Sequence, residues 1–80
     1  MKPEWFERDI IAPANEGERT AVRVAQRALR CDPTGEMDTA TRSALRGAQY
    51  LFGLPVTGVL DEATAIKVDG LRPYTLQGDE

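Results

Sequence analysis

The chain repeats itself at an offset of 23 residues, since 22–45 read VRVAQRALRCDPTGEMDTATRSAL and 45–68 read LRGAQYLFGLPVTGVLDEATAIKV. A unit this short cannot bury its own apolar face, so two overlapping units must close on each other. The repeat therefore predicts one small globule with internal pseudo-symmetry. Its identical positions are Arg23, Ala25, Gln26, Thr34, Gly35, Asp38, Ala40 and Thr41, which recur as Arg46, Ala48, Gln49, Thr57, Gly58, Asp61, Ala63 and Thr64.

The repeated motif T-G-x-Φ-D-x-A-T, in which Φ is an apolar residue, describes a turn that starts a helix. Its glycine suits a turn that needs a positive φ. Asp38 and Asp61 are expected N-caps, because a carboxylate accepts hydrogen bonds from first-turn amides and suits the positive end of the helix dipole. Thr41 and Thr64 follow three residues later. There each hydroxyl is expected to bond back to the backbone amide of the capping aspartate, as in a capping box.

Apolar residues recur with helical periodicity, and no strand pattern competes. A first helix is expected over 18–31, ended by Asp32-Pro33. A second helix follows Asp38 and reaches about residue 52, where Gly53 suits a left-handed cap. A third helix follows Asp61 and ends before Gly70. The sequence therefore predicts an all-α, compact three-helix bundle over 18–70, flanked by an N-terminal arm at 1–17 and a C-terminal tail at 71–80.

Composition excludes several classes of function. The chain has 80 residues, a net charge of −3, no histidine and one cysteine, Cys31. Nucleic acid is not expected as a partner, because no basic field exists; Arg19, Arg23, Arg27 and Arg30 are read as a solvated helix face. Disulfide, metal and cofactor sites are not expected. No apolar run is long enough to span a membrane. Neither a signal segment nor a catalytic set is found, so we expect a non-enzymatic protein synthesised in the cytoplasm.

These residues resemble the peptidoglycan-binding domain family, small three-helix modules found beside cell-wall hydrolases. The resemblance covers about residues 19–70 and follows the family's order of helix, turn, helix and turn. It is carried by Val22, Gln26 and Leu29; by Gly35, Met37, Asp38 and Thr41; by Ala44, Leu45 and Gln49; and by Gly53-Leu54 and Thr57-Gly58-Val59-Leu60-Asp61 with Thr64.

The resemblance implies non-catalytic attachment to bacterial peptidoglycan. Such recognition needs polar groups and an aromatic face along a shallow groove. For the two glutamines a structural role, hydrogen bonding to the turn backbone, is the alternative to ligand contact. The candidate ligand-binding residues are Arg23, Gln26, Arg46, Gln49 and Tyr50.

The family usually has bulky apolar residues where this chain has Ala25 and Ala48. Removing core volume costs about 2–5 kcal/mol if nothing refills it. The arm is unusually apolar, so we expect it either to fold back and refill the space or to reach another chain. Its candidate contact residues are Trp5, Phe6, Ile10 and Ile11.

The absence of an enzymatic domain and of a signal segment favours a stand-alone, bacteriophage-encoded protein that reaches the wall in a virion or after lysis. The alternative is a virion structural protein, such as a capsid decoration or tail component, that uses its arm for protein–protein assembly with other virion proteins. A third possibility is a domain excised from a larger hydrolase.

Overall fold

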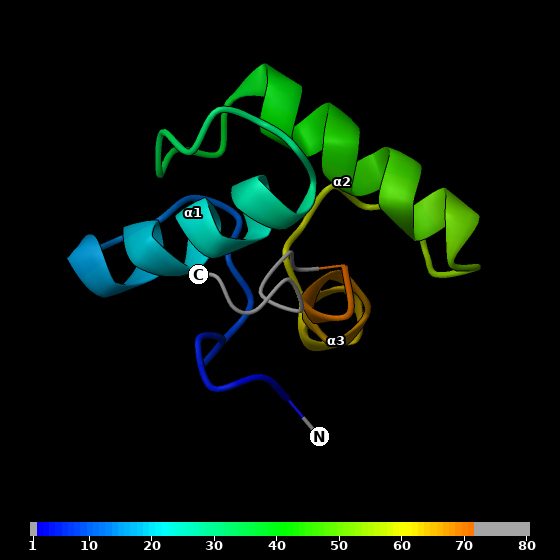
Figure 1. Ribbon diagram of the computed structural model, residues 1–80, viewed down its shortest axis with the longest axis horizontal. Coiled ribbons are helices and arrows are strands. Elements are labelled where there is room, and N and C mark those ends of the chain that lie inside the picture. The colour runs from blue at the N-terminus through cyan, green and yellow to red at the C-terminus, as the bar shows by residue number, and fades with distance from the viewer. Residues whose placement is uncertain (1, 72–80) are drawn as a thin grey trace.

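The computed structural model describes residues 2–71 and contains three helices. α1 spans Glu16–Ala28, α2 spans Thr39–Leu51 and α3 spans Glu62–Asp69. α3 packs against both α1 and α2, and Figure 1 shows it nearly end-on beneath them. The predicted all-α three-helix arrangement is confirmed. Of the predicted tail, only Leu71 lies within the described residues. None of the described helices is long and apolar enough to cross a membrane.

The predicted bounds of the first helix were wrong at both ends. α1 starts at Glu16, because the Asn15 side chain accepts a 2.9 Å hydrogen bond from the Glu18 amide. The Glu18 carboxylate in turn accepts from the Ala14 amide at 2.8 Å. The helix is capped at Leu29 and ends before Asp32-Pro33, because Arg30 adopts a left-handed backbone with φ 65°. The arm therefore gives way to α1 at residue 16.

α1 and α2 end in the same hydrogen-bonding pattern. The Cys31 amide donates to the Gln26 carbonyl at 2.7 Å, and the Leu54 amide donates to the Gln49 carbonyl at 2.9 Å. These bonds define a Schellman motif, whose left-handed position favours glycine. Gly53 occupies it after α2 with φ 73°, as the sequence predicts. Arg30 occupies the same position after α1.

The N-terminal arm is part of the globule. Phe6 and Ile10 are each only 2% exposed and belong to the core. Ile10 and Leu60 exchange backbone hydrogen bonds of 2.9 and 3.1 Å, and the Trp5 indole donates to Asp69 Oδ1 at 2.8 Å. The structure thus shows the arm folded back onto the helices. Phe6 and Ile10 are buried in the core and are not available to a partner chain. Ile11 remains 68% exposed.

The core lies where the arm, the three helices and the two turns meet. Its residues come from every part of the described chain, so no helix can be removed without opening it. The buried apolar cluster comprises Phe6, Ile10, Ala21, Val22, Ala25, Ala28, Met37, Leu45, Leu60, Ala65 and Val68, with Trp5 and Leu29 packed against it.

Candidate binding site around the duplicated turns

Each copy of the repeat has one buried glutamine whose side chain packs against the turn of that copy. Gln26 extends from α1 and Gln49 from α2, and both side chains are 0% exposed. A buried amide is costly unless its hydrogen-bonding groups are satisfied. The contacts of these two amides therefore decide whether either one is available to a ligand.

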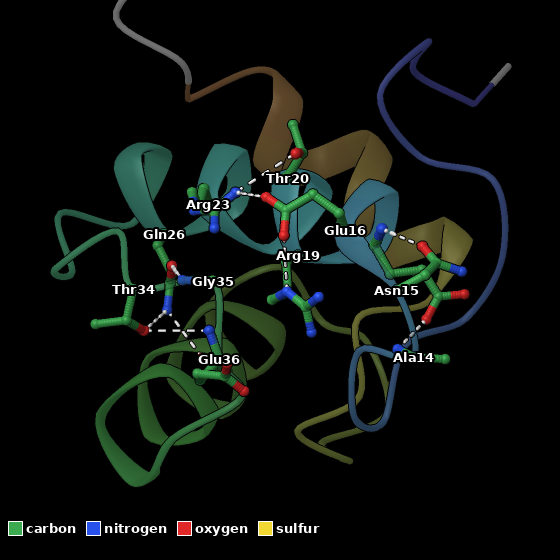
Figure 2. A network of polar contacts seen from close by, with 11 residues as sticks. Ala14, Asn15, Glu16, Arg19, Thr20, Arg23, Gln26, Thr34, Gly35 and Glu36 are labelled. Carbon is green, nitrogen blue, oxygen red and sulfur yellow. Dashed lines mark hydrogen bonds and ion pairs between the residues drawn. The ribbon is translucent and has the colours of Figure 1, made fainter.

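The Gln26 amide is fully engaged in the first turn, as Figure 2 shows for its contacts with that turn. Its Nε2 group donates to Thr34 Oγ1 at 3.0 Å, to the Glu36 carbonyl at 3.0 Å and to Thr41 Oγ1 at 2.8 Å. Its Oε1 atom accepts from the Gly35 amide at 2.9 Å. One side chain thus holds both flanks of the turn and the first turn of α2.

The Gln49 amide repeats this pattern in the second turn. Its Nε2 group donates to Thr57 Oγ1 at 3.3 Å, to the Val59 carbonyl at 3.0 Å and to Thr64 Oγ1 at 2.9 Å. Its Oε1 atom accepts from the amides of Thr57 and Gly58, each at 2.9 Å. The second copy therefore gains one backbone hydrogen bond that the first copy lacks.

These contacts give Gln26 and Gln49 the structural role that the sequence left open. Each NH₂ group has two hydrogens and already faces three acceptors, and each carbonyl oxygen faces turn amides. No atom of either side chain is exposed to reach a glycan. The two glutamines are therefore corrected from candidate ligand contacts to the groups that shape the turns.

The two aspartates cap their helices as predicted. Asp38 Oδ1 accepts from the Thr41 amide and Asp61 Oδ1 accepts from the Thr64 amide, both at 2.9 Å. Hydrogen bonding from the Thr41 side chain, then from its amide, holds the pKa of Asp38 below its usual value. The Thr41 hydroxyl thus joins the cap carboxylate to Gln26 rather than closing a capping box with the Asp38 amide.

An arginine from the preceding helix lies over the glycine of each turn. A Cβ atom on Gly35 would fall 3.1 Å from Arg23 Nε, and one on Gly58 would fall 3.1 Å from Arg46 Nη1. Both glycines also have a positive φ, of 82° and 76°. Any larger residue would strain the backbone and displace the arginine, so the glycine positions the guanidinium against its turn.

The two arginines differ in their charge environment. Arg23 Nη1 lies 3.0 Å from Glu16 Oε2, an ion pair visible in Figure 2. Hydrogen bonds from Arg19 and Arg23 lower the pKa of Glu16, so this carboxylate stays ionised. The residue equivalent to Glu16 in the second copy is Thr39, which carries no charge. Within residues 2–71, the Arg46 side chain makes no hydrogen bond or ion pair.

Tyr50 lies on the same side of α2 as Arg46. The two residues are four positions apart in one helix, so their side chains are neighbours on its surface. The tyrosine side chain is 76% exposed, and Arg46 is also exposed. Of the five predicted ligand-binding residues, the structure thus leaves Arg46 and Tyr50 together on an open face. Arg23 is half-buried and paired.

Sequence reasoning missed two residues that matter here, Glu16 and Thr39. Both signals were present in the sequence, because each lies seven positions before its arginine, two helical turns away on the same face. Cys31 is a half-buried free cysteine whose surroundings disfavour its reactive thiolate form. Burial, followed by the charges of Asp38 and Asp32, raises the pKa of its thiol. No cluster of potential metal ligands occurs among residues 2–71.

The turns, their capping aspartates and the helices that carry the glutamines lie within a segment that matches a known family. A family model described as a peptidoglycan binding domain matches residues 18–68, which is more than half of the chain. No curated protein and no solved structure matches this chain. The matched segment runs from the first turn of α1 to the last turn of α3. The chain therefore belongs to the peptidoglycan-binding domain family.

Proposed function

We propose that this chain is a non-catalytic module that attaches to bacterial peptidoglycan through the outer face of α2. Arg46 and Tyr50 supply the contact. The observation that carries this proposal is the guanidinium of Arg46, which has no polar partner among residues 2–71 and lies beside an exposed aromatic ring, within a domain of the peptidoglycan-binding family.

The chemistry of the two side chains suits a wall polymer. An exposed guanidinium forms bidentate hydrogen bonds with carboxylates, which peptidoglycan carries on its stem peptides. An aromatic ring provides a flat apolar surface against which the C–H face of a sugar can pack. Because Arg46 already rests on the second turn, little side-chain freedom is lost on binding.

The first copy lacks this combination. Arg23 is neutralised by Glu16, and the position equivalent to Tyr50 is Arg27. To bind a carboxylate of peptidoglycan, Arg23 would first have to give up its ion pair with Glu16, so the net binding free energy would be small. Binding through one copy of the repeat is therefore favoured over binding through both.

Assembly through the arm, the alternative predicted from the sequence, loses its main anchors because Phe6 and Ile10 are core residues. The bacteriophage or virion setting stays a prediction.

Co-sedimentation with insoluble, protein-free peptidoglycan tests the proposal. Arg46→Ala and Tyr50→Ala should each weaken retention about tenfold, the effect of losing a contact worth about 1.4 kcal/mol. Arg27→Ala is the matched control and should bind like the unaltered chain. If both variants bind normally, the outer face of α2 is the wrong surface. If the unaltered chain is not retained, attachment to peptidoglycan itself is refuted.

A further inference from the structure

A second arginine, Arg42, lies one helical turn before Arg46 on the outer face of α2. The two residues are four positions apart, so their side chains are neighbours, about 6 Å apart along the helix axis. Both are exposed. A Cβ atom on Gly58 would lie 3.1 Å from Arg46 Nη1 and 3.8 Å from the Arg42 carbonyl oxygen. The second turn therefore packs against the part of α2 that carries both arginines.

The first copy of the repeat shows how such a pair holds an acid. The residues equivalent to Arg42 and Arg46 are Arg19 and Arg23. Glu16 contacts both of them, with Oε1 2.9 Å from Arg19 Nε and Oε2 3.0 Å from Arg23 Nη1. Figure 2 shows the carboxylate lying between the two guanidinium groups. One carboxylate thus uses its two oxygens to bridge two arginines one helical turn apart.

The second copy has the same pair of arginines without the acid. Thr39 stands at the position equivalent to Glu16, and α2 contains neither aspartate nor glutamate. Among residues 2–71, neither Arg42 nor Arg46 forms an ion pair. Like charges four positions apart on a helix repel each other. A bound anion would remove this repulsion in the second copy, as the glutamate does in the first.

The N-terminal arm positions the Arg42 side chain. Arg42 Nη2 donates a hydrogen bond to the backbone carbonyl of Ile11 at 3.3 Å. A guanidinium group has five N–H donors, so four remain for an anion. Because the side chain is already held at its far end, less of its freedom is lost when an anion binds.

We propose that Arg42 and Arg46 together bind one free carboxylate of a peptidoglycan stem peptide, in the position that Glu16 takes in the first copy. This inference rests on the proposed attachment through α2 and adds to it the chemical group that is recognised. Arg42 is then a specificity-determining residue of the site. Stem peptides with free carboxylates bind, whereas peptides in which those carboxylates are amides do not fill the space between the two arginines.

Co-sedimentation with two samples of insoluble, protein-free peptidoglycan tests this site. One sample is unmodified, and in the other the carboxylates are converted to methylamides. Arg42→Gln removes the charge and keeps an amide donor for the Ile11 carbonyl. It should weaken retention on the unmodified sample about tenfold and change nothing on the methylamide sample, to which the unaltered chain should itself bind about tenfold more weakly.

Arg19→Gln is the matched control, because Arg19 is the equivalent residue and is already paired with Glu16. It should keep full retention on the unmodified sample. Urea denaturation of both variants checks that each remains folded.

The possible failures are distinguishable. If Arg46→Ala weakens retention and Arg42→Gln does not, attachment through α2 stands and the two-arginine site is overturned. An equal loss for Arg42→Gln on both samples would also overturn it, because the contact would not involve a carboxylate. Stripping phosphate-bearing polymers with hydrofluoric acid should leave retention unchanged, and a loss there would assign the pair to phosphate instead. If the unaltered chain is not retained on the unmodified sample, the attachment is refuted and this inference with it.

Discussion

The two copies of the repeat are alike inside and different outside. In both, a buried glutamine ties together a glycine turn and the aspartate-capped helix that follows, and the capping distances agree. Outside, the first copy pairs its arginine with Glu16 and is covered by the arm, whereas the second gives Arg46 no ionic partner in the described part of the chain. The shared interior is what the fold requires, so the differences in the exterior are where function can be sought.

The largest expected effect concerns the arm over the first copy. Phe6→Ala should lower the free energy of unfolding by about 3–5 kcal/mol, because it removes a fully buried aromatic side chain from a small core. Ile11→Ala, five residues later and mostly exposed, should change it by less than about 0.5 kcal/mol. Urea denaturation measures both. If both substitutions changed the free energy of unfolding equally little, the arm would not be part of the stabilising core.

Replacing the glutamines compares the interiors of the two copies. Gln49→Leu should cost about 3 kcal/mol, because similar volume is kept while buried turn groups lose their partners. Gln26→Leu should cost less, since Gln26 accepts from one backbone amide and Gln49 accepts from two. Urea denaturation again gives the values. The reverse order would contradict the contacts seen in the second turn.

The smallest stability effect concerns the helix ends. Arg30→Gly should raise the free energy of unfolding by about 1 kcal/mol, because glycine adopts the left-handed backbone of the cap without strain. Gly53→Arg is the reciprocal change and should cost a similar amount, since open space surrounds that position. Thermal unfolding of the two variants measures the pair. A loss of stability in Arg30→Gly would show that the arginine side chain has a compensating contact.

Sequence patterns predicted most of this fold because its signals are local. The aspartate caps and Gly53 set the bounds of α2 and α3, and both helices formed where expected. The bounds of α1 were missed for two reasons. Asn15 with Glu18 three residues later is a capping pattern that was overlooked. Arg30 gave no sign of a left-handed backbone, because that geometry is imposed by the helix end rather than by the residue.

The candidate site was less predictable because its chemistry depends on packing. A glutamine at a repeated position looks the same whether it holds a turn or binds a ligand, and only the burial of Gln26 and Gln49 decides. Likewise, Arg23 and Arg46 occupy identical motif positions. Their difference comes from Glu16 and Thr39, which lie outside the motif, and from the ion pair that the folded helix allows.

The most direct test of the central comparison transfers the acid from one copy to the other. Thr39→Glu places a carboxylate seven residues before Arg46, as Glu16 stands before Arg23, and suits the first turn of α2. We expect this variant to fold normally and to lose about tenfold in retention on insoluble peptidoglycan, while the matched Thr39→Gln variant keeps full retention. Unchanged retention in Thr39→Glu would contradict the claim that an unpaired Arg46 is what distinguishes the second copy.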